Sequence, residues 1–203
     1  MEVLMSYIST VSAIAFCASF VLASSAFADD QPGDLERDLV ASQKIFIEAT
    51  KTQRQTIKVV AQTDRPNATY KVGDKMKLTV NVDKDAYLYI LNKGTSKATT
   101  WLFPNAYHKE AFVKAGKSRI PADADKWTID VRGPVGKDVL YIYASTSPLP
   151  EKHRKTLLSD WQNGKAFANL DRSDDEFLRD LAAAPAESQG AALVIVTVAA
   201  DKK

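Results

Sequence analysis

The middle of the chain alternates short apolar segments with residues that interrupt regular structure. Between residues 102 and 136 these interruptions fall at Pro104, Asn105, Gly116, Pro121, Gly133, Pro134 and Gly136. The segments between them are short, and several begin or end in an aromatic residue, which is typical of strands joined by turns. The pattern therefore predicts a compact, mainly β domain.

Two neighbouring segments show the two kinds of strand that such a domain contains. Residues 76–82 alternate apolar and polar side chains, as in a strand with one face in water, whereas residues 86–91 are apolar throughout, as in a central strand. Only Asp83, Lys84 and Asp85 separate them. This tight link predicts that the two strands pair as a hairpin. Further strands are expected at residues 57–61, 99–103, 118–120, 127–131, 139–145 and 192–198.

Helical spacing of apolar residues predicts three helices around these strands. The first spans about residues 34–52, with Asp34 as its cap, and a second is expected over residues 151–165. The third begins at Ser173, where Glu176 completes a capping box. The first helix either packs on the sheet or offers its apolar face to a partner. The predicted fold class is mainly β, an immunoglobulin-like β-sandwich of about seven to eight strands with an N-terminal helix and two short C-terminal helices.

The first residues of the chain have the features of an export signal. Residues 11–27 are apolar or small, and the sequence Ala26, Phe27, Ala28 precedes two aspartates. Small residues at these two alanine positions fit signal peptidase, so we predict a signal peptide over residues 1–28 with cleavage after Ala28. The alternative is an uncleaved anchor, for which the apolar stretch is short, since a bilayer needs about 20 residues. Translation starts at Met1 or at Met5.

These features predict a periplasmic or secreted protein with no membrane span after cleavage. Residues 29–203 are expected to form a single domain around a core module at 57–150. The only cysteine, Cys17, lies within the predicted signal peptide, so the domain is expected to be stabilised by its core without disulfides. The 27 basic residues are interleaved with 25 acidic ones, and this mixture does not favour a nucleic-acid surface.

The residue types used in catalysis and metal binding form no recognisable motif in this sequence. His108 and His153 are far apart and have no cysteine beside them, which does not match a zinc site. The paired aspartates lack the glycine and distal glutamate of a calcium-binding EF-hand loop, and no serine lies in a Gly-x-Ser-x-Gly turn. We therefore expect a protein that is not an enzyme and uses no cofactor.

The polar loop that follows Pro104 carries Tyr107, the aromatic residue most expected to be exposed. Aromatic side chains on strands more often fill a core, but exposed ones can bind protein or sugar rings. The candidate binding residues are Asn105, Tyr107, His108, Glu110, Trp101 and Trp127.

A family resemblance rests on five short motifs in a fixed order. They are Tyr70 with Gly73 and Asp74, residues 86–89, residues 102–105, residues 115–117 with Ile120 and Pro121, and Gly133 with Pro134 and Gly136. With these motifs the chain resembles, over about residues 57–150, the bacterial family called domain of unknown function 4384. The resemblance implies a β-sandwich module of exported proteins, also found beside kinase-like and protease-like domains, with no assigned catalytic residues. Lys109 and Glu110 depart from the family, which more often has asparagine there.

The expected function is that of an exported, non-enzymatic accessory module. Its partner would be another envelope or secreted protein, in a secretion or surface-assembly system, bound through the loop at 105–110 and neighbouring strand edges. The alternative is a module of the cell envelope that recognises glycan or peptidoglycan through exposed Trp101, Tyr107 or Trp127.

Overall fold

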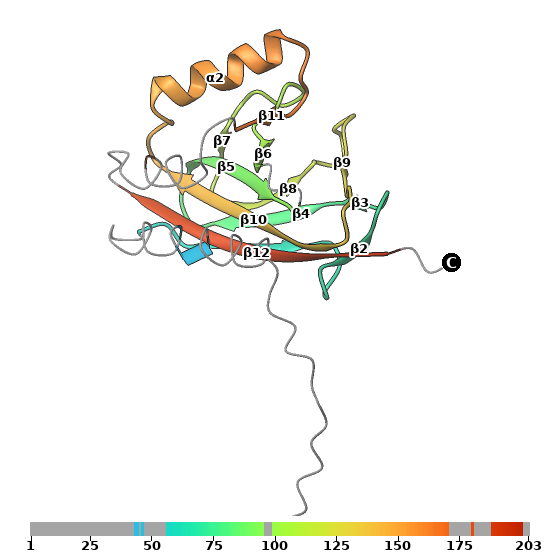
Figure 1. Ribbon diagram of the computed structural model, residues 1–203. Coiled ribbons are helices and arrows are strands. Elements are labelled where there is room, and N and C mark those ends of the chain that lie inside the picture. Colours follow the sequence, from blue (N-terminus) through green and yellow to red (C-terminus); the bar gives the residue numbers. More distant parts are fainter. Residues whose placement is uncertain are drawn as a thin grey trace, which may run out of the picture. The chain divides into compact units, whose positions relative to one another are not determined.

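The computed structural model describes residues 43, 44, 46, 56–95, 99–170, 180 and 188–200. These residues belong to one compact unit that spans residues 32–203. The predicted signal peptide lies outside the described residues, and so do most of the predicted first helix and third helix. The fold of the described residues is mainly β, as predicted (Figure 1).

The strands form one large sheet and two small ones. The small sheets are an antiparallel trio in the order β1-β4-β8 and the pair β3-β9, and the large sheet runs in the order β11-β6-β5-β10-β12-β2, with β7 also paired to β5. The strands of the small sheets are β1 (Val59–Thr63), β4 (Leu78–Val82), β8 (Gly116–Ile120), β3 (Lys75–Met76) and β9 (Ile129–Asp130). Those of the large sheet are β2 (Thr69–Lys71), β5 (Ala86–Lys93), β6 (Thr99–Phe103), β7 (Phe112–Val113), β10 (Gly136–Ser145), β11 (Ala168–Asn169) and β12 (Gln189–Ala199).

The last strand returns to the large sheet, as the sequence predicted. β12 pairs antiparallel with β10 along the whole length of β10, and at its other edge it pairs in parallel with the short strand β2. The long strands β10 and β12 lie side by side in Figure 1. A run of β-branched residues near the C-terminus is therefore part of the same sheet as the central strands.

The predicted hairpin between residues 76–82 and 86–91 is wrong. β4 lies in the three-stranded sheet, whereas both edges of β5 are taken by strands of the large sheet, β6 and β10. The link between β4 and β5 carries the chain from one sheet to the other, and its carboxylates bind neighbouring segments. Asp83 accepts the backbone N–H of Lys58 at 2.8 Å, and Asp85 accepts that of Ala115 at 2.8 Å.

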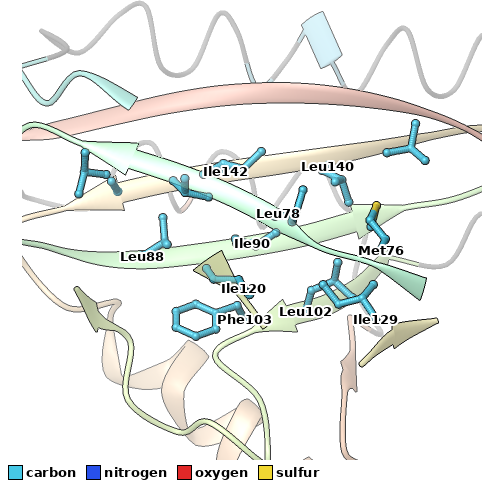
Figure 2. Packing of buried hydrophobic residues seen from close by; sticks show 14 of the residues in the cluster. Met76, Leu78, Leu88, Ile90, Leu102, Phe103, Ile120, Ile129, Leu140 and Ile142 are labelled. Atoms are coloured by element: carbon cyan, nitrogen blue, oxygen red, sulfur yellow. The ribbon is translucent and has the colours of Figure 1, made fainter. Parts of the chain in front are cut away.

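The main hydrophobic core contains side chains from all three sheets. The inward residues of β4 lie in the same cluster as one face of β5 and β10, with Ile120 of β8 and Ile129 of β9 (Figure 2). The apolar residues of the alternating strand β4 belong to this cluster, and so do those on one face of the apolar strand β5. Its most deeply buried aliphatic residues include Leu78, Leu88, Ile90, Leu140 and Ile142. Burial of each such side chain contributes on the order of 1.5–3 kcal/mol to stability.

The opposite face of the large sheet carries a second, aromatic cluster. Tyr89, Trp101 and Tyr141 belong to it, and so does Leu157 of α2 (Glu151–Gln162). Residues 43, 44 and 46 are helical, and the ring of Phe46 lies 5.0 Å from that of Tyr141. β5 and β10 are thus buried on both faces, which explains their uninterrupted apolar sequences.

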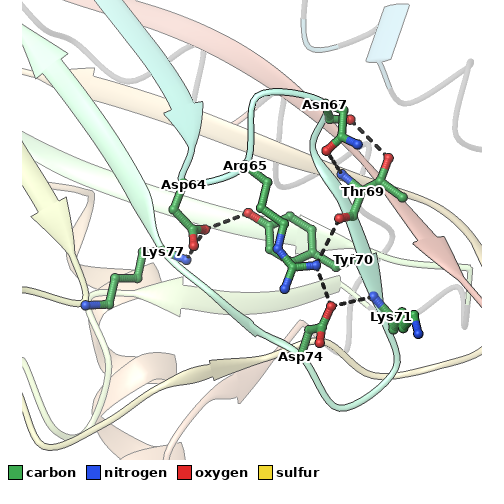
Figure 3. A network of polar contacts seen from close by, with 8 residues as sticks. All are labelled: Asp64, Arg65, Asn67, Thr69, Tyr70, Lys71, Asp74 and Lys77. Atoms are coloured by element: carbon green, nitrogen blue, oxygen red, sulfur yellow. Dashed lines mark hydrogen bonds and ion pairs between the residues drawn. The ribbon is translucent and has the colours of Figure 1, made fainter. Parts of the chain in front are cut away.

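A polar network joins the end of β1 to β2 and to the turn before β3 (Figure 3). The Tyr70 hydroxyl donates a hydrogen bond of 2.6 Å to Asp64, whose carboxylate also accepts the backbone N–H of Lys77 at 2.9 Å. Arg65 pairs with Asp74 and lies over the Tyr70 ring, 4.5 Å from its centroid. These contacts tie together segments that do not share a strand ladder.

Candidate functional site

The loop after β6 is a tight turn that presents Tyr107 at its tip. The backbones of Asn105 and His108 exchange two hydrogen bonds, of 2.9 Å and 3.2 Å, across the two residues between them. The backbone N–H of Ala106 donates to the carbonyl of Ala166 at 3.0 Å. The turn is therefore closed on itself and attached to the segment that follows α2.

The side chain of Asn105 fills the inside of this turn. Its amide nitrogen donates to the carbonyl of Leu102 at 2.9 Å, and its Oδ1 accepts the backbone N–H groups of Tyr107 and His108, both at 2.9 Å. Asn105 has no exposed surface. It is the residue that shapes the turn, and it is not available to touch a partner.

The other predicted residues of this loop lie at or near the surface. Tyr107 is 65% exposed, the largest value for an aromatic residue in the described part of the chain, as expected; Phe112 is 38% exposed. The ring of His108 lies 5.0 Å from that of Phe103, and its Nδ1 is 3.8 Å from a carboxylate oxygen of Asp125. Glu110 is exposed and accepts the backbone N–H of Phe112 at 3.2 Å. Lys109 and Glu110 are both exposed, so the surface beside Tyr107 carries charges of both signs.

Trp101 and Trp127 are not surface residues, contrary to the hypothesis that they could bind glycan. Trp101 is 1% exposed and packs edge-on against Tyr89, with ring centroids 6.0 Å apart. Trp127 is 7% exposed and meets Phe167 at a similar distance, 6.0 Å. Both indoles belong to the packed interior, since Trp101 is part of the aromatic cluster and Trp127 is part of the main core.

A row of polar side chains on the inner face of the large sheet was not predicted from the sequence. Asn169, Thr100 and Asn92 are neighbours in the ladders of β11, β6 and β5, and Asp138 follows on β10, two residues before the buried Leu140. The same face of these strands carries apolar core residues farther along. The sequence shows polar residues within these apolar strands. It does not show that they lie side by side, because this depends on the register in which the strands pair.

This polar row lines a cavity of about 480 Å³. Apolar side chains complete the wall, among them Met76, Leu102, Ile129, Val131, Phe167 and Val196, while Asp130 and Arg132 line it as exposed residues. The Oγ1 of Thr100 and the Oδ1 of Asn169 are 3.2 Å apart, within hydrogen-bond distance. The cavity therefore combines apolar walls with a few convergent polar groups, which is typical of small-molecule sites.

Asp138 is the carboxylate of this cavity. Its two oxygens accept hydrogen bonds of 3.3 Å, one from the side-chain amide of Asn92 and one from the backbone N–H of Thr95. Thr95 is itself held by a bond from its hydroxyl to the carbonyl of Pro134. Burial raises the pKa of Asp138 above its usual value, and these two neutral donors only partly oppose the effect.

Two kinds of site are not found in the part of the chain that the structure describes. No three His, Cys, Asp or Glu side chains lie together in a group that could hold a metal ion. No helix within the described ranges has the length and apolar character to cross a membrane.

Comparison with known proteins finds one family model that matches the central part of the chain. The model of a domain of unknown function, DUF4384, matches residues 69–148. This confirms the family resemblance and places the match from β2 to just past the end of β10, with the Tyr107 turn inside it. Neither the curated proteins nor the solved structures gave a match.

Proposed function

We propose that this protein, whose residues 69–148 carry the DUF4384 domain, is an exported, non-enzymatic module that binds another envelope or secreted protein. The contact surface is the turn at residues 105–108 with its exposed Tyr107. The observation that supports this proposal is the contrast within the turn, where Asn105 is fully buried and Tyr107 is 65% exposed.

A turn of this kind suits protein recognition because it is ordered before the partner arrives. Ordering a loop on binding costs free energy, and the hydrogen bonds within residues 102–108 supply that order in advance. Tyrosine offers a large, rigid surface with a polar end, and for this reason it is frequent among the residues that dominate binding energy. Lys109 and Glu110 beside it are exposed, so a polar rim can surround the aromatic contact.

We also propose that the scaffold is a β-sandwich in which the three-stranded sheet covers the large sheet. The shared hydrophobic cluster supports this arrangement, since β4 and β8 contribute side chains to it together with β5 and β10. Such a scaffold holds surface loops in fixed positions.

The test is a pull-down from envelope extract with the purified protein as bait. The wild type is compared with Tyr107→Ala and with Leu158→Ala, a control that removes a 49% exposed side chain from α2. We expect at least one protein to be recovered by the wild type and by the control but not by Tyr107→Ala. Equal recovery by all three baits, or none above background, would contradict the proposal.

Mass determination of the exported protein tests cleavage after Ala28 in the same preparation.

Cell-wall glycan is the weaker candidate for this surface. Two of the three aromatic residues that it would use, Trp101 and Trp127, are buried. Sedimentation with purified cell wall separates the two functions, because sedimentation that depends on Tyr107 would favour glycan over protein.

A further inference from the structure

The cavity on the inner face of β6, β5 and β10 holds a carboxylate that forms no ion pair with a described residue. Asp138 makes its two hydrogen bonds to an amide and to a backbone N–H, both neutral donors. By contrast, Asp74 pairs with Arg65, Asp85 pairs with Lys114, and Asp123 pairs with Lys77 and Arg119. Each of these paired carboxylates has a lowered pKa, whereas that of Asp138 is raised by burial.

Asp138 lies at a position that an apolar residue would be expected to occupy. It occupies an inward position on β10 in line with Leu140 and Ile142, where an apolar side chain would extend the core. Removing a carboxylate from water costs free energy unless a counter-charge compensates for it. Arg132 lines the same cavity but forms no ion pair with Asp138, whose carboxylate is held by two neutral donors, so a cationic ligand would supply the counter-charge.

We propose that this cavity binds a small polar molecule through a protonated primary amine that pairs with Asp138. Thr100, Asn92 and Asn169 offer hydrogen-bond donors and acceptors to the neighbouring hydroxyl or carbonyl groups of that molecule. The apolar wall, which includes Met76, Leu102 and Phe167, packs against its carbon skeleton. The volume of about 480 Å³ lies within the range of about 300–1,000 Å³ that is usual for small-ligand sites.

The same amine can come from an amino sugar or from an α-amino acid. Exposed Arg132 lines the cavity, which gives an amino acid a partner for its carboxylate, whereas the row of amides and the hydroxyl suits the hydroxyl groups of a sugar. The two sources share the contact with Asp138 and differ in the remainder of the molecule.

The experiment is an NMR titration of the full mature chain with two matched pairs of probes. Glucosamine is compared with glucose, and alanine with lactate, so that within each pair an ammonium is replaced by a hydroxyl. We expect one amine probe to shift the side-chain amide signals of Asn92 and Asn169, and its hydroxyl counterpart to bind at least tenfold more weakly. The pair that responds identifies the source.

Two variants test whether the ligand amine contacts Asp138. Asp138→Asn keeps the shape of the side chain and is expected to weaken amine binding at least tenfold. Asp123→Asn, which changes a 66% exposed carboxylate outside the cavity, is expected to leave binding unchanged. Thermal unfolding verifies that both variants are folded, and the shifts in the wild type locate the site even if Asp138→Asn does not fold.

Three outcomes would overturn the proposal. One is the absence of shifts at Asn92 and Asn169 with both amine probes at tens of millimolar. Another is equal binding of the amine and hydroxyl members of the pairs. The third is amine binding that survives in folded Asp138→Asn. None of these outcomes bears on the Tyr107 turn, whose role is tested by the pull-down.

Discussion

Asn105 holds Tyr107 in place through a hydrogen bond of 2.9 Å from the backbone N–H of Tyr107 to the side-chain Oδ1 of Asn105. One residue is fully buried and the other is the most exposed large hydrophobic side chain in the described part of the chain. A buried amide that binds three backbone groups thus fixes the backbone from which an exposed aromatic side chain projects. Asn105 thus shapes the turn, whereas Tyr107 supplies the surface that a partner would contact.

Replacing Asn105 is therefore expected to affect both stability and binding. Asn105→Ala leaves the carbonyl of Leu102 and the backbone N–H of Tyr107 without their side-chain partner, while the N–H of His108 keeps its bond to the backbone carbonyl of residue 105; a buried group left unpaired costs about 1–3 kcal/mol. Urea unfolding should show a loss of stability in that range, and recovery of the partner should fall although Tyr107 is intact. The control is Asn67→Ala, which removes a similar local bond of 3.2 Å to Thr69 from an exposed asparagine. A loss no larger than that of the control would contradict the role of Asn105.

Much of the fold was predictable because its signals are local. The alternation over residues 76–82 and the apolar run over 86–91 predicted strands that the structure contains as β4 and β5. Pro104 and Asn105 predicted a turn, and the polar residues that follow predicted that this turn is exposed. The β-branched segment 192–198 predicted β12, which is 11 residues long in the structure.

Pairing between strands was less predictable because it depends on contacts distant in sequence. The hairpin expected at Asp83 and Asp85 is absent since β5 is already paired at both edges. The cavity was not predicted for the same reason, because the residues that line it are distant in sequence. Asn92 and Asp138 are 46 positions apart, and only the ladder of β5 with β10 brings them within 3.3 Å. The burial of Trp127 likewise depends on Phe167, a residue beyond α2.

Close approach of two backbones at Gly190 makes this glycine intolerant of a side chain. A Cβ atom at this position would lie 2.0 Å from the carbonyl oxygen of Ile57, where β12 begins beside the segment that leads into β1. We expect Gly190→Ala to destabilise the protein by about 1–3 kcal/mol or more, because backbone must move to relieve the overlap. Chemical denaturation measures the loss. Gly133→Ala is the matched control, since its nearest neighbour is a methyl group of Val72 at an ordinary 3.5 Å. Equal effects of the two substitutions would show that the approach at Gly190 is easily relieved.

The bond between Tyr70 and Asp64 should make a pH-dependent contribution to stability. Burial alone would raise the pKa of Asp64, but the Tyr70 hydroxyl and the backbone N–H of Lys77 hold it below its usual value of 3.8. The stabilisation is therefore present above that value and is lost as the pH falls through the lower folded pKa. Tyr70→Phe is expected to cost about 1–2 kcal/mol near neutral pH and less in acid. Urea unfolding at about pH 7 and about pH 3 measures both. A cost that does not shrink in acid would assign the effect to packing.

Asp138 is expected to show the opposite pH dependence. Burial raises its folded pKa above the usual value of 3.8, so the unfolded chain releases this proton more readily than the folded protein. Stability is then lost as the pH rises from the ordinary value to the folded pKa, and it is constant below and above that interval.

Asp138→Asn removes this titration, so the variant should gain stability relative to the wild type as the pH rises through the same interval. The absolute difference at one pH also contains altered hydrogen bonds to Asn92 and Thr95, and for this reason the change with pH is the quantity to measure. Unfolding free energies at several pH values between about 3 and 8 provide it. Asp85→Asn is the control of opposite sign, because Lys114 lowers the pKa of Asp85 and its replacement should become more harmful as the pH rises. Parallel pH profiles for wild type and Asp138→Asn would show that the carboxylate in the cavity is as well solvated in the folded protein as in the unfolded chain, and would remove the reason for a ligand cation there.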